Sequence, residues 1–409
     1  MTSYQEAVRR LYALGNEVLT AKLGLERIFE MLAGLGNPER AYRTVHVAGT
    51  NGKGSTCAMI EAGLREAGIR TGLYTSPHLI EATERIQVDG LAVSQEQFAR
   101  AFDVVQAIPL DSPATYFEHV TAMAFWLFRE MRVQTAVIEV GLGGRLDATN
   151  VVQPAVTVIT PVDFDHQMYL GNTIEAIASE KAGILKAGIP SVVSRQRPEA
   201  MRVIEARAAE LGSRIIRTED FPVRDLVLDA RGSSFSGLRC PLAGEHQVEN
   251  AVAAALALQT IGVAPEGISA AHWPGRIEHV SPNPDIILDG AHNPAGAKAL
   301  SKYLKRFYSD RRLWMIFGAL TDKAADEVAA ELFPLAQELV LTTPSSPRAA
   351  DPDDLQKLAK RGETAPDIRS AIKLVQERAD ADDVVVITGS LYLVGEARAA
   401  LLDVRQSWG

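Results

Sequence analysis

The sequence predicts an α/β protein with parallel sheets, because short β-branched runs alternate with alanine-rich stretches of helical periodicity. In the first part of the chain these runs are apolar on both faces, which is typical of strands covered by helices on each side. Helical segments such as 55–67 and 116–129 separate them. The predicted strands are 44–48, 71–75, 135–140, 155–160 and 190–194.

The same alternation begins again near residue 285, after a turn-rich, β-rich region at 215–240. The stretch Ser281-Pro282-Asn283-Pro284 has the stiff, polar composition of a linker. We therefore expect a larger domain over residues 1–280, with a P-loop ATPase-like parallel sheet, and a smaller Rossmann-like α/β domain over 281–409. The second domain is predicted to contain a helix from about Pro294 and strands at 285–289, 313–317, 339–342 and 384–388.

Composition narrows the class of protein. The formal net charge is -9, which disfavours a nucleic-acid partner, since such proteins usually need a basic face. Only Cys57 and Cys240 occur, so neither a disulfide scaffold nor a zinc cluster is expected. The first residues have the pattern of an amphipathic helix, and no apolar stretch is long enough to span a bilayer. We expect a cytoplasmic monomer that binds small molecules, without nucleic-acid or membrane partners.

A glycine-rich loop between a predicted strand and a predicted helix is the strongest single motif. Glycines let backbone N–H groups turn toward an anion, and the helix N-terminus adds partial positive charge. Lys53 can reach terminal phosphates, and Ser55 or Thr56 can bind magnesium. Gly54 separates the lysine from Ser55, unlike the common P-loop, so an unrelated glycine-rich turn is the alternative. The loop consists of Gly49, Thr50, Asn51, Gly52, Lys53, Gly54, Ser55 and Thr56.

Polar side chains follow three further strands of the predicted first sheet. Ser76 follows the second strand, Glu139 ends the third, and His166 follows the fourth. Because ligands of parallel sheets bind at the carboxyl ends of strands, these groups are placed to meet Ser55 near the phosphates. Carboxylate and hydroxyl oxygens with an occasional imidazole suit magnesium. Each residue alone is more often an ordinary surface or capping group, and their number beside one loop favours a site.

Two more segments carry candidate charges. Lys181 lies in Glu180–Ile184, which has the pattern of a helix start, and a surface lysine is the alternative. In the second domain, Asp289 and His292 lie at a strand-to-helix junction, where they can approach a ribose hydroxyl and a phosphate. Arg276 lies near the predicted joint and can hold a phosphate oxygen, or instead form a structural ion pair.

Together these motifs resemble the Mur ligase superfamily, and within it the folylpolyglutamate and dihydrofolate synthases. They occur in the family's order across nearly the whole chain, and two of them, EVGLGGRLDATN and DGAHNP, are highly specific. The inserted Gly54 is normal for this family. The motifs are GTNGKGST (49–56), SPHL (76–79) with ERI (84–86), TYFE (115–118), EVGLGGRLDATN (139–150), DHQMYLGNT (165–173), EKAGI (180–184), GEHQVENA (244–251), PGR (274–276) and DGAHNP (289–294).

The resemblance implies an ATP-dependent ligase that activates a folate-type carboxylate as an acyl phosphate and joins it to glutamate. It assigns ATP binding and the folate pocket to the first domain and the glutamate-ligase role to the second. Lys181 is implied to be carbamylated, and Lys53, Lys181, Arg276 and His292 to act in catalysis. ATP would be bound by the glycine-rich loop with Asn250, Arg276 and Asp289; two Mg²⁺ by Ser55, Ser76, Glu139 and His166; the folate by Thr115, Phe117, Arg145 and Asp147; and glutamate by His292, Ser390 and Tyr392.

Three other functions share parts of this pattern. A small-molecule kinase would need the phosphate loop and magnesium but not the second domain with its DGAHNP motif. A ligase acting on a cell-wall precursor would not need the SPHL and TYFE segments. A silent nucleotide-binding protein would have no need for Lys53, Glu139, His166 and Lys181 together. The sequence leaves open whether a folate ligase of this kind adds the first glutamate, later ones, or both.

Overall fold

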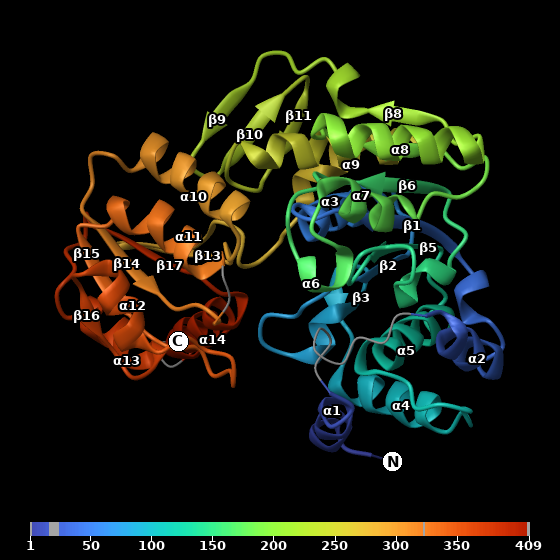
Figure 1. Ribbon diagram of the computed structural model, residues 1–409, viewed down its shortest axis with the longest axis horizontal. Helices are drawn as coiled ribbons and strands as arrows, with labels where there is room; N and C mark the ends of the chain where they lie inside the picture. The colour runs from blue at the N-terminus through green and yellow to red at the C-terminus, as the bar shows by residue number, and fades with distance from the viewer. Residues whose placement is uncertain (1, 16–23, 322–323, 407–409) are drawn as a thin grey trace. The chain divides into compact units, whose positions relative to one another are not determined.

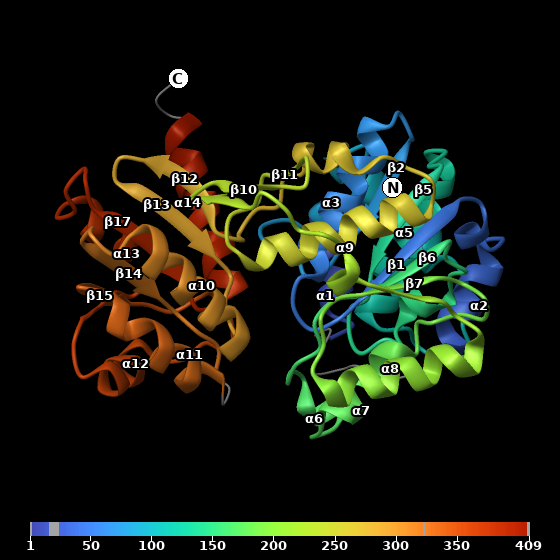
Figure 2. The ribbon, with the colours of Figure 1, turned by 90° about the horizontal axis from the view of Figure 1, so that it is seen from above.

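The computed structural model describes residues 2–15, 24–321 and 324–406, and these form two compact units (Figures 1 and 2). The first unit comprises residues 1–225, 235–239 and 249–271. The second comprises 226–234, 240–248 and 272–409. The chain thus passes between the units several times, whereas the sequence pattern predicted a single division at residue 280.

The first unit is built on an eight-stranded sheet in the order β4-β3-β2-β5-β1-β6-β7-β8. Six neighbouring strands of this sheet are parallel, in the order β2-β5-β1-β6-β7-β8. Next to β2, strands β3 and β4 form an antiparallel edge. The central strand β1 is buried at every position after its first. The strands are β1 (Arg43–Ala48), β2 (Thr71–Tyr74), β3 (Ile86–Val88), β4 (Leu91–Ala92), β5 (Thr135–Glu139), β6 (Val156–Ile159), β7 (Ser191–Val193) and β8 (Ile215–Arg217).

Helices pack against this sheet in two apolar clusters. One cluster joins α1, α2, α4 and α5 to β2, β3 and β5, and another joins α7 and α8, which lie side by side in Figure 2, to β6 and β7. Capping boxes at Ser94 and Thr115 fix the starts of α4 and α5. The helices are α1 (Tyr4–Tyr12), α2 (Glu26–Gly34), α3 (Lys53–Glu66), α4 (Gln95–Gln106), α5 (Tyr116–Glu130), α6 (Gln167–Leu170), α7 (Ile174–Ala182), α8 (Pro198–Leu211) and α9 (His246–Thr260).

The second unit contains a six-stranded sheet in the order β12-β13-β17-β14-β15-β16, parallel except for β12 at one edge. Its apolar core lies between the sheet and α10 and α11. The elements are β12 (Glu278–Pro282), β13 (Asp285–Asp289), α10 (Pro294–Phe307), β14 (Leu313–Phe317), α11 (Ala324–Leu332), β15 (Glu338–Leu341), α12 (Pro352–Ala359), β16 (Glu363–Thr364), α13 (Ile368–Gln376), β17 (Val384–Thr388) and α14 (Leu391–Gln406).

The prediction of a linker at 281–284 is wrong, because this segment forms a hairpin. Ser281 and Pro282 end β12, and Asn283 and Pro284 make the turn into antiparallel β13. A hairpin turn at a sheet edge uses the same polar and proline-rich residues as a linker, so composition alone does not separate the two. The turn-rich region 215–240 contains β8 and a small sheet of β9 (Val227–Asp229), β10 (Gly232–Phe235) and β11 (Leu238–Cys240).

The α/β fold class is confirmed, with a large parallel-rich sheet in one unit and a second, smaller sheet in the other. Among the residues that the structure describes, no helix is both long and apolar enough to cross a membrane.

Candidate active site

The glycine-rich loop joins β1 to α3, as predicted, and glycine is required at two of its positions. Gly49 has φ 148° and Gly52 φ 86°, and a Cβ at either would collide with Thr160 or Asn250 respectively. The loop is tied to the segment after β6, because Thr50 N donates to Pro161 O at 2.9 Å and Asp163 N donates to Thr50 Oγ1 at 3.0 Å. These hydrogen bonds fix the position of the loop against the segment after β6.

Lys53 is the first residue of α3, and its side chain is 18% exposed. Its Nζ donates to Thr50 O at 3.2 Å and lies 4.0 Å from Glu139 Oε1. Ser55 and Thr56 follow in the first turn of α3, and both are buried. The ammonium group thus lies over the N-terminus of a helix, where an anion is favoured.

Glu139 ends β5, directly beside β1 in the sheet, and its carboxylate is buried. Its Oε2 accepts from Ser76 N at 3.3 Å, so the segment after β2 reaches the same point. The structure therefore brings together Lys53, Glu139 and Ser76, three residues that the sequence placed at different strand ends.

Lys181 lies in the last turn of α7, which corrects the prediction that Glu180–Ile184 begins a helix. Its side chain is buried, and Nζ donates to Gly49 O at 2.7 Å. Burial, together with the nearby charge of Lys53, lowers the pKa of Lys181 to about 7, although Asp165 and Asp147 act in the opposite direction. The alternative of a surface lysine is therefore wrong.

Close backbone packing places Lys181. A Cβ on Gly144 would lie 2.6 Å from Glu180 O, and one on Gly183 would lie 2.5 Å from Arg145 Cα. Asn150 Nδ2 donates to both Arg145 O and Gly183 O, at 2.9 and 3.1 Å. These residues belong to motifs named above, but their role in placing Lys181 was not predicted. The two glycines lie in distant segments, and their close packing appears only in the fold.

His166 begins α6 with a left-handed backbone conformation, φ 48°. Its Nε2 lies 3.7 Å from Asp165 Oδ1, and its side chain is 38% exposed. Among the residues that the structure describes, no group of three or more His, Cys, Asp or Glu gathers in a way that could hold a metal ion. The predicted magnesium set contains only Glu139 and His166 of these types, so the remaining ligands would be hydroxyls, water and nucleotide oxygens.

The predicted folate residues have different environments. Thr115 caps α5, and the Phe117 ring lies against Gly141, where any Cβ would collide with it. Arg145 is more than half exposed and pairs with Glu180 at 2.7 Å. Asp147 is buried, and its Oδ2 accepts from Leu142 N at 2.8 Å. Thr115 and Phe117 thus have structural contacts of their own, and the Asp147 carboxylate binds the loop that carries it.

In the second unit, Asp289 ends β13 and its carboxylate is buried. It accepts from Ile277 N and Ala291 N, both at 2.9 Å. Burial raises the pKa of Asp289, and the charge of Arg276 opposes that shift. A Cβ on Gly290 would lie 2.5 Å from the Arg276 guanidinium, so glycine lets the arginine lie over this junction.

His292 and Ser390 lie at two helix starts of the same unit. His292 lies just before α10 and its Nδ1 is 2.8 Å from Gly290 O. Ser390 is buried just before α14, and its Oγ accepts from Tyr392 N at 3.2 Å. Tyr392 is 43% exposed. Asn250, which the motifs assign to ATP, belongs to the first unit and is buried against Gly52.

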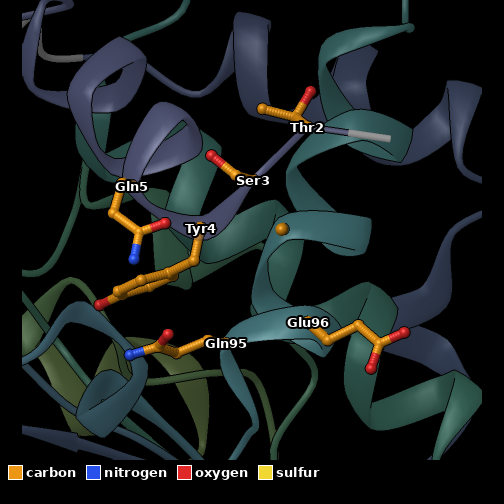
Figure 3. Close-up of a pocket in the computed structure, with 7 residues that line it drawn as sticks. Thr2, Ser3, Tyr4, Gln5, Gln95 and Glu96 are labelled. Carbon is orange, nitrogen blue, oxygen red and sulfur yellow. The ribbon is translucent and has the colours of Figure 1, made fainter.

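A cavity of about 260 Å³ lies elsewhere in the first unit (Figure 3). It is lined by the starts of α1 and α4, with Ser3, Tyr4, Gln95 and Glu96 among its residues, and it contains none of the predicted site residues. It therefore adds nothing to the chemistry of the loop.

Comparison with known proteins agrees with the motifs. The family model for the Mur ligase middle domain matches residues 47–258, and that for the Mur ligase glutamate ligase domain matches residues 275–391. The dihydrofolate synthase/folylpolyglutamate synthase of Bacillus subtilis is 37% identical, over 98% of this chain and 99% of the relative. The folylpolyglutamate synthase of Lacticaseibacillus casei is 38% identical, over 92% of this chain and 94% of the relative.

Solved structures show the same relationship. Escherichia coli FolC in complex with DHPP and ADP has a TM-score of 0.89 at 32% identity and covers 99% of each chain. Mycobacterium tuberculosis folylpolyglutamate synthase complexed with ADP and AMPPCP has a TM-score of 0.87 at 34% identity, over 97% of this chain and 99% of that one. The predicted resemblance is confirmed, and with it an ATP-dependent ligase: the chain belongs to the Mur ligase family, among its folylpolyglutamate and dihydrofolate synthases.

Proposed function

We propose that this protein joins L-glutamate to dihydropteroate, to reduced folates, or to both, with ATP converted to ADP and phosphate. The observation that carries the proposal is the meeting of Lys53, Glu139 and Lys181 at one glycine-rich loop. The names of the relatives supply the substrates, since the residues alone specify phosphate chemistry. A cytoplasmic location and a monomeric state belong to this proposal.

The first step is attack of the acceptor carboxylate on the γ-phosphate of ATP, which gives an acyl phosphate and ADP. A carboxylate is a poor electrophile, and the phosphoryl group makes one of its oxygens a leaving group. Lys53 and the backbone N–H groups of the loop stabilise the charge on the transferring group, as in other phosphoryl transfers. The glutamate amine, in its neutral form, then attacks the carbonyl carbon of the acyl phosphate. The tetrahedral intermediate loses a proton from nitrogen and its C–O bond to phosphate breaks, which gives the amide and inorganic phosphate.

The residues fit a magnesium-bound nucleotide. Glu139 offers a buried carboxylate beside Lys53, and Ser55 lies in the first turn of α3. Magnesium usually takes one or two carboxylates and keeps phosphate oxygens and water, which matches this sparse set. We assign Ser55, Ser76, Glu139 and His166 to two Mg²⁺ sites. When bound, the ions neutralise charge on the phosphates and on the leaving group.

Lys181 has the properties needed for carbamylation. Only a neutral amine adds to carbon dioxide, and burial beside Lys53 keeps a large fraction of Lys181 neutral near pH 7. A carbamate there would replace one of two neighbouring positive charges by a negative one. We propose that this modified side chain helps to organise the second magnesium.

The remaining assignments follow the family motifs. Thr115, Phe117, Arg145 and Asp147 would form the folate pocket, and Asn250, Arg276 and Asp289 would contact ATP. The Asp289 carboxylate already accepts two backbone N–H groups, so it would shape its junction as much as it would contact a ribose. His292, Ser390 and Tyr392 would bind glutamate.

An isotope experiment tests the proposal and separates it from kinase activity. The protein is incubated with ATP, glutamate and dihydropteroate or tetrahydrofolate whose reacting carboxylate carries ¹⁸O. An acyl-phosphate ligase transfers one ¹⁸O to inorganic phosphate, and release requires both the acid and the amino acid. Phosphate without ¹⁸O, a phosphorylated product that persists, or turnover without glutamate would contradict the proposal. Comparing the two acceptors shows whether the first glutamate, later ones, or both are added.

A further inference from the structure

His46 lies in the middle of β1, fully buried, and no motif assigned it a role. Its Nε2 is 2.9 Å from Thr149 Oγ1. Its Nδ1 is also buried, and among the residues that the structure describes it has no hydrogen-bond partner. A leucine of similar size would avoid that cost, so the histidine needs a reason beyond packing.

Thr149 connects His46 to the predicted folate loop. Its Oγ1 makes a hydrogen bond with Asp147 Oδ1, and its backbone N donates to the same oxygen at 3.0 Å. Burial raises the pKa of Asp147, but both of its oxygens accept backbone N–H groups, from Thr149 and from Leu142, which favours the ionised form. An ionised carboxylate only accepts, so the one hydroxyl proton of Thr149 points to Asp147. The hydroxyl oxygen must then accept from His46, which fixes the histidine as the tautomer protonated on Nε2.

That tautomer is stable in this environment. Burial, with a smaller contribution from Lys186, lowers the pKa of His46 to about 3, so the ring stays neutral. A neutral ring with its proton on Nε2 leaves a lone pair on Nδ1, which is the atom without a partner. The chain of donors therefore runs in one direction, from His46 through Thr149 to Asp147.

The chain ends at the turn that supports Phe117. Asp147 Oδ2 accepts from Leu142 N at 2.8 Å, and Leu142 follows Gly141, against which the Phe117 ring packs. Strand β1 also leads directly into the phosphate loop. Three buried polar groups thus link the strand beneath the nucleotide to the surface assigned to the acceptor.

We propose that His46 is a positioning residue for the acceptor pocket: its Nε2 proton orients Thr149, which holds Asp147 and, through Leu142, the turn beneath Phe117. The role rests on the proposed function, because it gives this pocket to a folate-type acceptor. His46 touches neither substrate nor reacting atoms.

Three substitutions at position 46 test the role of one nitrogen. The amide nitrogen of His46→Gln reaches the position of Nε2, whereas that of His46→Asn reaches only the position of Nδ1, and His46→Leu has no donor. We expect KM for the acceptor to rise about tenfold in the Leu and Asn variants, a typical effect of losing a hydrogen bond, and to return close to wild type in Gln. KM for ATP stays within about twofold. Equal effects in all three, or a fall in kcat alone, would overturn the role.

A double-mutant cycle and a substrate-free measurement complete the test. Thr149→Val should match His46→Leu, and the double variant should be no worse than Thr149→Val alone, because both break one chain. Additive effects of the two substitutions would contradict a shared chain.

Amide exchange at Leu142, measured without substrates, should be faster in His46→Leu and normal in His46→Gln. Unchanged exchange would contradict the chain, whereas absence of acceptor-dependent turnover in the wild type would contradict only the proposed function.

Discussion

Both units place a strand-to-helix junction at the end of a buried strand, but they handle charge in opposite ways. At the Gly49–Lys53 junction, two lysine side chains donate to backbone carbonyls, Lys53 to Thr50 O and Lys181 to Gly49 O. At the Asp289–Asn293 junction, a carboxylate accepts two backbone N–H groups and has Arg276 beside it. The first junction holds two lysine side chains, one of them 4.0 Å from the Glu139 carboxylate, whereas the second places one arginine beside a carboxylate that already accepts two backbone N–H groups.

The difference indicates which junction is arranged to receive an anion. Burial is the main cause of the lowered pKa of Lys181, and the charge of Lys53 lowers it further, so the two side chains repel each other when both are protonated. A phosphate group, or a carbamate on Lys181, relieves that repulsion. The second junction gains less from an added anion, so its residues act more through shape and hydrogen bonding.

Lys53→Ala carries the largest expected effect. Removing the ammonium that we propose to face the terminal phosphates should lower kcat for glutamate-dependent ADP formation by about a thousandfold, at the upper end for one charge-stabilising group. Because Lys53 is partly exposed and makes one hydrogen bond, the melting temperature should change little. Lys298→Ala, on α10 of the second unit, is a matched control. Retained turnover in Lys53→Ala would remove the phosphate role of the loop.

Lys181 gives the next largest effect and a pH dependence with a defined sign. Its pKa is lowered to about 7, so the side chain is mostly the charged ammonium below pH 7 and mostly the neutral amine above it. Carbamate formation from ¹³C-bicarbonate, followed by NMR, should therefore rise around pH 7, whereas an ordinary lysine needs pH near 10.5. Lys181→Ala should lose this signal and lower activity by about tenfold to a hundredfold, as for loss of a supporting group at a metal site. A short carboxylic acid should restore part of the activity.

A signal absent in the wild type, or wild-type activity in Lys181→Ala, would contradict the carbamate. Lys186 is a useful internal comparison, because burial also lowers its pKa, but it donates to Asn150 O away from the loop. Lys186→Ala should therefore keep the ¹³C signal.

The sequence predicted the fold well where burial repeats regularly. The strands at 285–289, 313–317 and 384–388 occur at the predicted residues, because short apolar runs bounded by polar turns have few alternatives. It failed at Ser281–Pro284, where a hairpin turn and a linker share composition. It also placed Lys181 at the start of a helix, although a lysine in the last turn with Gly183 at the C-cap is the usual signal of a helix end.

The site was predictable as a set of positions but not as a set of roles. Strand ends converge in any parallel sheet, so Lys53, Glu139 and Ser76 could be placed together from the pattern. The hydrogen bonds of Asp147 and Asp289 depend on backbone N–H groups that the chain folds toward them. The burial that lowers the pKa of Lys181 comes from packing between distant glycines, which no local motif reports.

Asp289→Asn tests the self-contained character of the second junction. One oxygen of the carboxylate becomes an NH₂ group, which cannot accept from Ile277 N or Ala291 N, so one buried donor loses its partner. A buried unpaired donor costs about 1–3 kcal/mol. Amide exchange at Ile277 or Ala291 should become faster by a corresponding factor, with the first unit unchanged. Normal exchange at both amides, with lost activity, would instead make Asp289 a direct ligand of the nucleotide.

Tyr308→Phe has the smallest expected effect and concerns acid stability of the second unit. Tyr308 Oη donates to Asp285 Oδ2 at 2.7 Å. Burial favours the neutral acid, but hydrogen bonds from His279 and Tyr308, with the charges of His279 and Arg231, hold the pKa of Asp285 below its ordinary value. Burial raises the pKa of Tyr308 to about 12, so its hydroxyl remains a donor at neutral pH.

A lowered carboxyl pKa stabilises the fold above the unfolded value, near pH 4, and this stabilisation is lost as pH falls through the folded value. Removing the tyrosine hydroxyl should raise the pKa of Asp285, so acid unfolding should begin at a higher pH. At pH 7 the variant should lose about 0.5–1.5 kcal/mol, as expected for one hydrogen bond. Amide exchange in β13, followed from pH 7 to pH 3, measures both effects. If amide exchange in β13 became faster at the same acidic pH in the variant and the wild type, His279 and Arg231 alone would hold the Asp285 carboxylate ionised. The tyrosine hydroxyl would then contribute only packing.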